Sequence, residues 1–343
     1  MENDMNDKAS GQVAQPPRPD AGDDPMESAV RACLADAYKL AGRLDRLPGE
    51  NLNYLLTVNG NEKYVFKIVD EDMPRAVVEL EFEVVRHARQ AGFSVRLPKI
   101  IENQYGNIET RIKLPRDGHF RSRIIEFIDG TDLSTVSDIS DILIENVGKT
   151  LAEFDRAMST FDHPAAHRNH RWNLAESLQH EDKMRYVSEP EKRVLLQWAF
   201  DLFRDARPGL DRLPWQFIHG DAHDENLMVE GDAVVGLIDF GDCCYNPRVC
   251  EIAICMAYLM MRSEAPEAAA RRLLEGYEWL CPLTVAEREA IYPLICGRIA
   301  VSLCIANARK HIDSLNPNWF GGEARTWKFL RTLRDGIPLD FCP

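Results

Sequence analysis

The spacing of apolar residues changes near residue 128 and divides the chain into two parts. In the first part, Asn53–Val58 and Tyr64–Ile68 are apolar-rich runs of strand length on either side of the glycine-containing turn Asn59–Glu62. This pattern predicts a β-hairpin. Further strands are predicted at 95–102, 108–114 and 123–127, a short amphipathic helix at 29–41, and a helix at 74–90 that ends at Gly92. The first part therefore predicts a small antiparallel sheet that carries one helix.

From residue 138 onward, the apolar residues recur with the period of an α-helix. One long helix is predicted from the shared face of Ile142, Val147, Leu151, Phe154 and Met158. Further helices are predicted at 192–203, 249–261, 267–279, 284–312 and 323–334. Two short apolar runs at 216–218 and 234–238 interrupt this region and predict a pair of buried strands.

These two patterns together predict an α+β fold of two lobes. The N-lobe is expected at residues 25–127 and the larger, mainly helical C-lobe at 128–343, with Ile128-Asp129-Gly130 as the link between them. Residues 1–24 are polar and rich in Pro, Gly and Asp, and such a segment buries too little apolar surface to offset its ordering entropy. We expect that segment to be a disordered tail.

Composition narrows the class of protein. The chain has 343 residues, 45% of them apolar and 28% charged, which is typical of a soluble globular protein. A net charge of −14 argues against a general nucleic-acid binder, and fits a cationic substrate or solubility alone equally well. No run approaches the roughly 20 apolar residues of a membrane helix, and no signal-peptide core is seen, so no membrane partner is expected. Nine cysteines, an odd number without a secretion signal, predict reduced thiols in a cytoplasmic protein. Monomer and homodimer both stay open.

Two motifs carry the predicted chemistry. The first is His219-Gly220-Asp221-Ala222-His223-Asp224-Glu225-Asn226, and the second is Ile238-Asp239-Phe240-Gly241-Asp242. Phosphoryl transfer needs one Asp to accept the proton of the attacking hydroxyl, and an Asn and a second Asp to hold Mg²⁺ against nucleotide phosphates. Gly220 and Gly241 would allow tight turns beside the acids. Asp and Asn also form ordinary turns, but both motifs in this order favour catalysis.

Lys67 lies within an apolar strand, where a buried ammonium needs a negative partner. On the helix at 74–90, Glu81 falls on the apolar face, whereas Glu79 and Glu83 point away. We therefore expect a Lys67–Glu81 pair that holds the ammonium against the nucleotide phosphates. A lysine head that extends to water is the alternative.

The segment before the first hairpin, Pro48–Asn53, offers backbone amides and Asn51 as a further phosphate contact. The segment lacks a GxGxxG pattern, and a plain entry loop is the alternative for most of its residues. The chain contains no GxxxxGK[ST] motif, which excludes the P-loop class.

These residues together resemble the aminoglycoside phosphotransferase and choline kinase superfamily, which has a protein-kinase-like fold, over roughly residues 40–335. Within it, Phe161-Asp162-His163-Pro164, Arg171-Trp172-Asn173-Leu174, Gly241-Asp242 running on to Tyr245 and Glu251-Ile252-Ala253, and Leu280–Thr284 look most like hydroxylysine kinases. The resemblance implies that Asp221 is the catalytic base, that Asn226 and Asp239 bind Mg²⁺, and that Lys67 and Glu81 position the nucleotide. It also implies that the backbone from Glu126 to Ile128 contacts the purine. One departure from the hydroxylysine kinase pattern, in which Gln stands at the Glu81 position and an acid at that of Glu79, leaves Glu79 open as the partner of Lys67.

The implied reaction transfers the γ-phosphoryl group of ATP or GTP to the hydroxyl of a small amino-bearing metabolite, with 5-hydroxylysine or a relative as the favoured acceptor. Choline or ethanolamine, homoserine and aminoglycosides are alternative acceptors, and a catalytically silent nucleotide-binding module is a further alternative. Candidate substrate contacts are Asp242, Trp172, Tyr245 and His223. For Asp242 a capping role is also open, and for Trp172 a place in the core.

Two residues near the motifs are assigned structural roles. His219 is expected to pack and hydrogen-bond so that it holds the loop, because Asp221 already supplies the base. Glu251 is expected to pair with an arginine such as Arg248.

Overall fold

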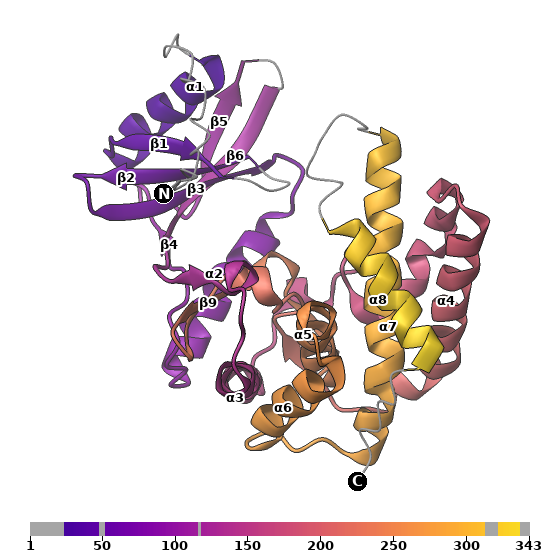
Figure 1. The fold of residues 1–343 in the computed structure, drawn as a ribbon. Coiled ribbons are helices and arrows are strands. Elements are labelled where there is room, and N and C mark those ends of the chain that lie inside the picture. Colours follow the sequence, from indigo (N-terminus) through magenta and orange to yellow (C-terminus); the bar gives the residue numbers. More distant parts are fainter. Residues whose placement is uncertain (1–23, 48–51, 116–117, 313–321, 337–343) are drawn as a thin grey trace, which may run out of the picture.

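The computed structural model describes residues 24–47, 52–115, 118–312 and 322–336. The predicted tail up to residue 23 and the predicted phosphate contact Asn51 lie outside the described residues. The strands of the N-terminal part form a sheet in the upper left of Figure 1, and the helices that follow gather below it and to its right. The fold is thus of mixed α and β type, with the sheet in the N-terminal region and helices in the C-terminal part, as the sequence predicts.

The N-terminal sheet has six antiparallel strands. Its main path is β1 (Arg43–Arg46), β2 (Asn53–Val58), β3 (Glu62–Asp70), β6 (Gly118–Glu126) and β4 (Ile100–Ile101), and β5 (Thr110–Leu114) also pairs with β6. The predicted hairpin is confirmed as β2 and β3, with Asn59 and Gly60 at positive φ (48° and 80°) in the turn. The strand expected at 95–102 is reduced to β4.

Side chains alternate across β3 and β6, so the two faces of the sheet differ in character. Phe66, Ile68 and Ile124 face a small core closed by α1 (Pro25–Cys33) and the π-helical turn η1 (Leu34–Tyr38). These two elements replace the single helix predicted at 29–41. Lys67 and Arg123 are paired in register and lie on the opposite face, toward helix α2 (Arg75–Gln90). Helix α2 ends at Gln90, and Gly92, whose φ is +86°, follows two residues later.

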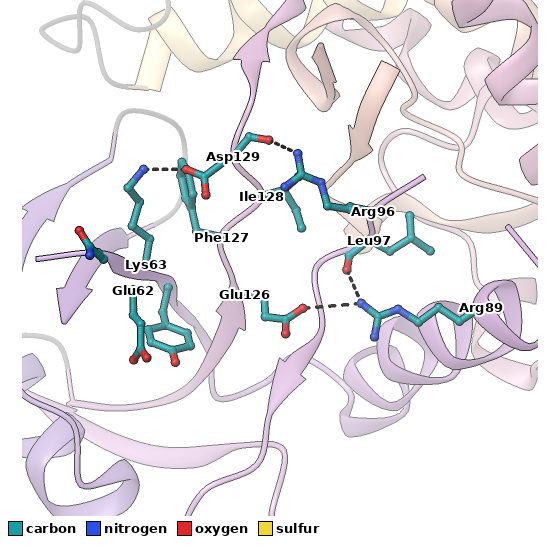
Figure 2. A pocket seen from close by; sticks show the side chains of 11 residues that line it. Glu62, Lys63, Arg89, Arg96, Leu97, Glu126, Phe127, Ile128 and Asp129 are labelled. Atoms are coloured by element: carbon teal, nitrogen blue, oxygen red, sulfur yellow. Dashed lines mark hydrogen bonds and ion pairs between the residues drawn. The ribbon is translucent and has the colours of Figure 1, made fainter. Parts of the chain in front are cut away.

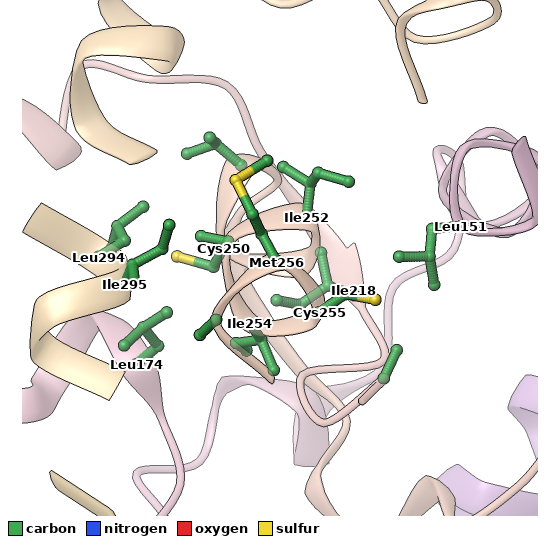
Figure 3. Close-up of a cluster of buried hydrophobic side chains, with 14 of the residues drawn as sticks. Leu151, Leu174, Ile218, Cys250, Ile252, Ile254, Cys255, Met256, Leu294 and Ile295 are labelled. Atoms are coloured by element: carbon green, nitrogen blue, oxygen red, sulfur yellow. The ribbon is translucent and has the colours of Figure 1, made fainter. Parts of the chain in front are cut away.

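The C-terminal part contains every long helix that the sequence predicts. These are α3 (Asp141–Met158), α4 (Pro190–Leu210), α5 (Val249–Arg262), α6 (Pro266–Glu278), α7 (Val285–Ile312) and α8 (Glu323–Gly336). Helix α5 is at the centre, and Figure 3 shows its side chains pointing outward on all sides toward Leu151, Leu174, Leu294 and Ile295. A helix that is apolar all round requires such burial. The 3₁₀ segment η4 (Leu174–Tyr186) was not predicted.

Helix α7 corrects one expectation. By length and composition it could cross a membrane, whereas no segment of that kind was expected; it is the single such helix among the described residues. In this fold 72% of its most apolar window is buried. It packs on α4, α5, η4 and α8, which is the position of a core helix.

Short strands between α4 and α5 carry the two predicted motifs. Strand β8 (Trp215–Ile218) pairs with β11 (Cys244–Pro247), and β9 (Leu227–Glu230) pairs with β10 (Ala233–Leu237) and with β7 (Thr131–Asp132). Strands β8 and β10 were predicted, whereas β7, β9 and β11 were not. The remaining short helical turns are η2 (Leu133–Thr135), η3 (Pro164–His167), η5 (Asp224–Asn226) and η6 (Phe240–Asp242). The lobe boundary at residue 127 stays a prediction.

Candidate active site

Two buried side chains hold the loop after β8 in place through hydrogen bonds. His219 is fully buried, and its Nε2 lies 3.0 Å from the carbonyl oxygen of Ile238, so it ties this loop to the second motif. Glu251 of α5 is also fully buried and accepts hydrogen bonds from the backbone N–H groups of His219 and Gly220. The structural role expected for His219 fits these contacts. The pairing expected for Glu251 is wrong, because Arg248 instead binds the buried carboxylate of Glu287.

Backbone geometry at the two acids differs from the sequence expectation in one respect. Gly220 has φ +78°, and a Cβ there would lie 2.7 Å from the carbonyl oxygen of Asp242, so this position requires glycine. Gly241 has no positive φ. The left-handed residue of the second motif is Asp239 itself, with φ +63°, a strained conformation for a non-glycine residue that is typical of functional sites.

Residues from three separate elements converge beside these loops. The Asn226 side-chain amide donates to the carbonyl oxygen of Asp221 at 2.8 Å and to its Oδ2 at 3.2 Å. The backbone N–H of Ile238 donates to the carbonyl oxygen of Asn226 at 3.0 Å and so holds Asp239 next to this pair. Lys67 of β3 donates to Asp239 Oδ1 at 3.0 Å. The two motifs and the strand lysine therefore form one site.

The oxygens at this site suit a hard divalent cation. Because Asn226 uses its amide nitrogen to bind Asp221, its Oδ1 is the atom left to bind a metal ion. Carboxylate and amide oxygens are the ligands that Mg²⁺ and Ca²⁺ accept, and Mg²⁺ in particular uses few protein ligands together with phosphates and water. Within the described parts of the chain, no cluster of three or more His, Cys, Asp or Glu residues offers a different metal site.

The predicted Lys67–Glu81 pair is not formed. Glu81 is buried, as its place on the apolar face of α2 predicted, but both of its oxygens lie 2.7 Å from Nη2 of Arg123. Arg123 is the register partner of Lys67 on the neighbouring strand and therefore presents its guanidinium to the same helix. A guanidinium forms stronger hydrogen bonds with a carboxylate than an ammonium does. Arg123 therefore pairs with Glu81, and Lys67 pairs with Asp239. Glu79, the other candidate partner, pairs with Arg75 at 2.9 Å.

Arg298 of α7 is a site residue that the sequence analysis missed. Its side chain is 3% exposed and forms an ion pair with Oδ1 of Asp221, 77 residues away in the chain. A single charged residue in the apolar stretch of a core helix was the available signal.

The charges around Asp221 keep it ionised. His223 Nε2 lies 3.4 Å from the other carboxylate oxygen, Oδ2. Burial alone would raise the pKa of Asp221, but the charges of His223 and Arg298 outweigh it and lower that pKa well below its ordinary value. The charge of Lys67 likewise lowers the pKa of Asp239.

The four residues predicted to contact substrate differ in how close they lie to Asp221. His223 touches Asp221 directly and stacks on Tyr258, with ring centroids 4.6 Å apart. Trp172 lies under the Arg298 guanidinium, 4.7 Å from its ring centroid. Asp242 lies 3.4 Å from Nδ1 of His170, and the Tyr245 ring packs on His167 and Trp215. His223 and Trp172 are thus closest to the predicted base, and all four assignments stay predictions.

The residues expected to contact the purine line a separate cavity of about 380 Å³. Figure 2 shows its lining: the Asp129 side chain meets Lys63, its carbonyl oxygen meets Arg96, and the Glu126 carboxylate faces Arg89. Glu126 and Ile128 belong to this lining, but Lys67, Asp221, Asn226 and Asp239 do not. The cavity lining therefore includes part of the predicted link segment but none of the convergent acids, and the purine contact stays a prediction.

Comparison with known proteins agrees with this geometry. Residues 44–293 match the model of the phosphotransferase enzyme family, APH. Hydroxylysine kinase of Mus musculus is 27% identical over 299 residues, which cover 81% of this chain and 79% of that protein. Homoserine kinase of Methylobacillus flagellatus is 24% identical over 255 residues, 71% of each chain.

Solved structures show the same fold. Amicoumacin kinase hAmiN, in complex with AMP-PNP, Ca²⁺ and Ami, superposes with a TM-score of 0.70 at 19% sequence identity, covering 92% of this chain and 96% of that one. Its fold is therefore shared by this chain. Since the family model spans more than half of the sequence, the chain belongs to the phosphotransferase enzyme family and is a phosphotransferase that acts on an alcohol group.

Proposed function

We propose that this protein transfers the γ-phosphoryl group of ATP or GTP, in the presence of Mg²⁺, to the hydroxyl of a small amino-bearing metabolite, with 5-hydroxylysine or a close relative as acceptor. The observation that carries the proposal is the convergence of Lys67, Asp221, Asn226 and Asp239 at one point. These are the groups that phosphoryl transfer requires, brought together from three elements.

Each of these side chains has a defined task in the proposal. Asp221 accepts the proton of the attacking hydroxyl, and its ionised state at neutral pH suits that task. Asn226 and Asp239 hold the divalent cation, which supplies charge neutralisation to the nucleotide phosphates when it is bound. Lys67 already lies at Asp239, from where its ammonium can turn toward the same phosphates. Glu81 acts on this site only indirectly, because it fixes Arg123 beside Lys67.

The choice of acceptor is supported by the related proteins. Hydroxylysine kinases of Mus musculus, Bos taurus and Xenopus laevis align over 81–82% of this chain at 26–27% identity, and homoserine kinases align as well. Both acceptors named there are amino acids with a side-chain hydroxyl. A net charge of −14 is compatible with a substrate that carries one or more ammonium groups.

A panel of alcohols tests the proposal directly. The full chain is assayed with ATP and with GTP, in the presence of Mg²⁺, against 5-hydroxylysine, homoserine, choline, ethanolamine and an aminoglycoside, with nucleoside diphosphate release coupled to an optical readout. We expect turnover with 5-hydroxylysine to exceed turnover with every other acceptor. Preferred turnover of choline or an aminoglycoside would contradict the proposed acceptor but leave the phosphotransferase in place.

Nucleotide binding without turnover is the outcome that would contradict the proposal as a whole. It would be seen as an increase in melting temperature with nucleotide and Mg²⁺ while no acceptor of the panel is phosphorylated. That result would instead support the silent nucleotide-binding module considered from the sequence.

A further inference from the structure

Arg298 makes contacts in the site besides its ion pair with Asp221, so neutralisation of Asp221 alone does not explain its position. Its guanidinium carbon lies 4.7 Å from the ring centroid of Trp172 and 5.5 Å from that of Tyr258. Its Nη2 binds Asp221, and its Nε donates to the hydroxyl of Tyr258 at 3.3 Å. The rings and these two bonds fix the plane of the guanidinium.

The remaining nitrogen of Arg298 has no partner. Its Nη1 is buried and makes no hydrogen bond, although Arg298 as a whole is only 2% exposed. An unsatisfied buried donor is costly, so a ligand that supplies the missing acceptor would gain binding free energy at this nitrogen. Nη1 and Nη2 together form the end of the guanidinium fork, the edge that binds a carboxylate through two parallel hydrogen bonds.

The guanidinium fork of Arg298 and the predicted metal ligand Asn226 contact Asp221 at different oxygens. Asn226 approaches Asp221 at Oδ2, whereas Arg298 approaches at Oδ1. Trp172 and Tyr258 also come from the C-terminal part, whereas Lys67 reaches the site from the N-terminal sheet. The fork and the Asn226 amide therefore contact different oxygens of the base, so a ligand of the fork does not compete with Asn226 for Asp221.

We propose that Arg298 determines specificity by binding the α-carboxylate of an amino acid acceptor through Nη1 and Nη2. This inference rests on the proposed function and specifies which part of the acceptor is recognised. In the free protein Asp221 occupies half of the fork; when the acceptor binds, its carboxylate replaces Asp221 on Nη2 and satisfies Nη1. The exchange leaves the number of ion pairs at Arg298 unchanged and releases Oδ1 of Asp221 to meet the acceptor hydroxyl. Substrates without a carboxylate cannot bring about that release.

Two acceptors that differ only in the carboxylate test the inference. 5-Hydroxylysine is compared with 1,5-diaminopentan-2-ol, which keeps the hydroxyl and both amines. The full-length wild-type chain, Arg298→Gln and Arg298→Lys are each assayed for kcat and KM with Mg²⁺ and saturating nucleotide. In the wild type we expect kcat/KM for 5-hydroxylysine to exceed that for the diamino alcohol by on the order of 100-fold, the size of effect expected when one member of a buried charge pair is missing.

The readout for the variants is the ratio of the two kcat/KM values, because Arg298 also contacts the base Asp221 and its loss changes turnover of both acceptors. Arg298→Gln is expected to raise KM for 5-hydroxylysine about 100-fold and to bring the ratio of the two kcat/KM values close to one, and Arg298→Lys, which keeps the charge but loses the fork, should retain an intermediate ratio. Arg248→Gln is the matched control, because Arg248 also binds a buried carboxylate, Glu287, but has no contact with Asp221. That variant is expected to lower the melting temperature without changing the ratio.

Three results would overturn the inference. The first is an equal kcat/KM for both acceptors in the wild type, which needs no variant to fold. The second is a ratio of the two kcat/KM values in Arg298→Gln that stays at the wild-type value, which would show that the arginine does not recognise the carboxylate. The third is a wild type that phosphorylates neither compound but phosphorylates a panel acceptor without a carboxylate. That result would refute the role of Arg298 and leave the kinase assignment in place. If the panel acceptor instead has a carboxylate, the inference is supported although the proposed acceptor is wrong.

Discussion

Replacing Glu251 by Gln tests how the fold supports the loop that carries Asp221. Glu251 is fully buried, and burial raises its pKa from 4.5 to about 7. A carboxyl group whose pKa is higher in the folded protein than in the unfolded chain takes up protons on folding. Its contribution is therefore fully present below pH 4.5 and is lost as the pH rises through about 7. Above that pH, the backbone N–H groups of His219 and Gly220 must hold a buried charge.

The size of this effect follows from the pKa shift. The pKa of Glu251 is raised by roughly 2.5, and a change of one in pKa corresponds to about 1.4 kcal/mol, so about 3.5 kcal/mol of unfolding free energy is lost in total as the pH rises from below 4.5 to above 7. Glu251→Gln removes this titration. The Gln side-chain oxygen can still accept from His219 and Gly220, and the amide nitrogen occupies the place of Oε1, which has no hydrogen-bond partner. We therefore expect the unfolding free energy of the variant minus that of the wild type to increase by about 2.5 kcal/mol from pH 5 to pH 8.

Urea unfolding of the full chain at pH 5, 6, 7 and 8 measures the difference. Glu287→Gln provides the matched control, because Glu287 is equally buried but has the opposite shift. Burial would raise its pKa, yet hydrogen bonds from Arg248 and Thr284 outweigh that effect and lower it. Its contribution is therefore present above pH 4.5 and lost only at lower pH, so Glu287→Gln should be destabilised at all four pH values with a wild-type slope. Parallel stability curves for the wild type and Glu251→Gln would refute the reasoning.

Three further changes have defined outcomes. Asp221→Asn should lower kcat by about 10²–10⁴-fold in a coupled assay while nucleotide affinity changes little, and near-normal turnover would remove the base assignment. Asp239→Ala should abolish Mg²⁺-dependent nucleotide binding in calorimetry; an unchanged Kd would place the cation elsewhere. Gly276→Ala should destabilise the protein by more than about 2 kcal/mol in urea unfolding, because the added Cβ would lie 2.1 Å from the carbonyl oxygen of Glu145 on α3. A loss below about 0.5 kcal/mol would mean that α3 and α6 can separate at little cost.

Most of the fold could be predicted from the chain because its signals are local. The apolar period specifies α3 and α5 to α8 within a few residues, whereas α4 continues seven residues beyond its predicted end at residue 203. The turn Asn59-Gly60 specifies the first hairpin. The strands β7, β9 and β11 were missed because each has only two to four residues and is defined by its partner rather than by its own pattern.

Sequence alone determined the order and spacing of Asp221, Asn226 and Asp239, because a short loop and hairpin suffice to bring such neighbours together. Only the tertiary structure decided which charges meet. The register of the sheet places Arg123 beside Lys67, and Glu81 pairs with Arg123. The packing of α5 and α7 places Glu251 and Arg298 against the loop that carries Asp221. A buried charge pairs with a group that the packing of folded elements brings close to it. Arg298 and Asp221 are 77 residues apart in the chain, and a local sequence pattern cannot predict a contact over that separation.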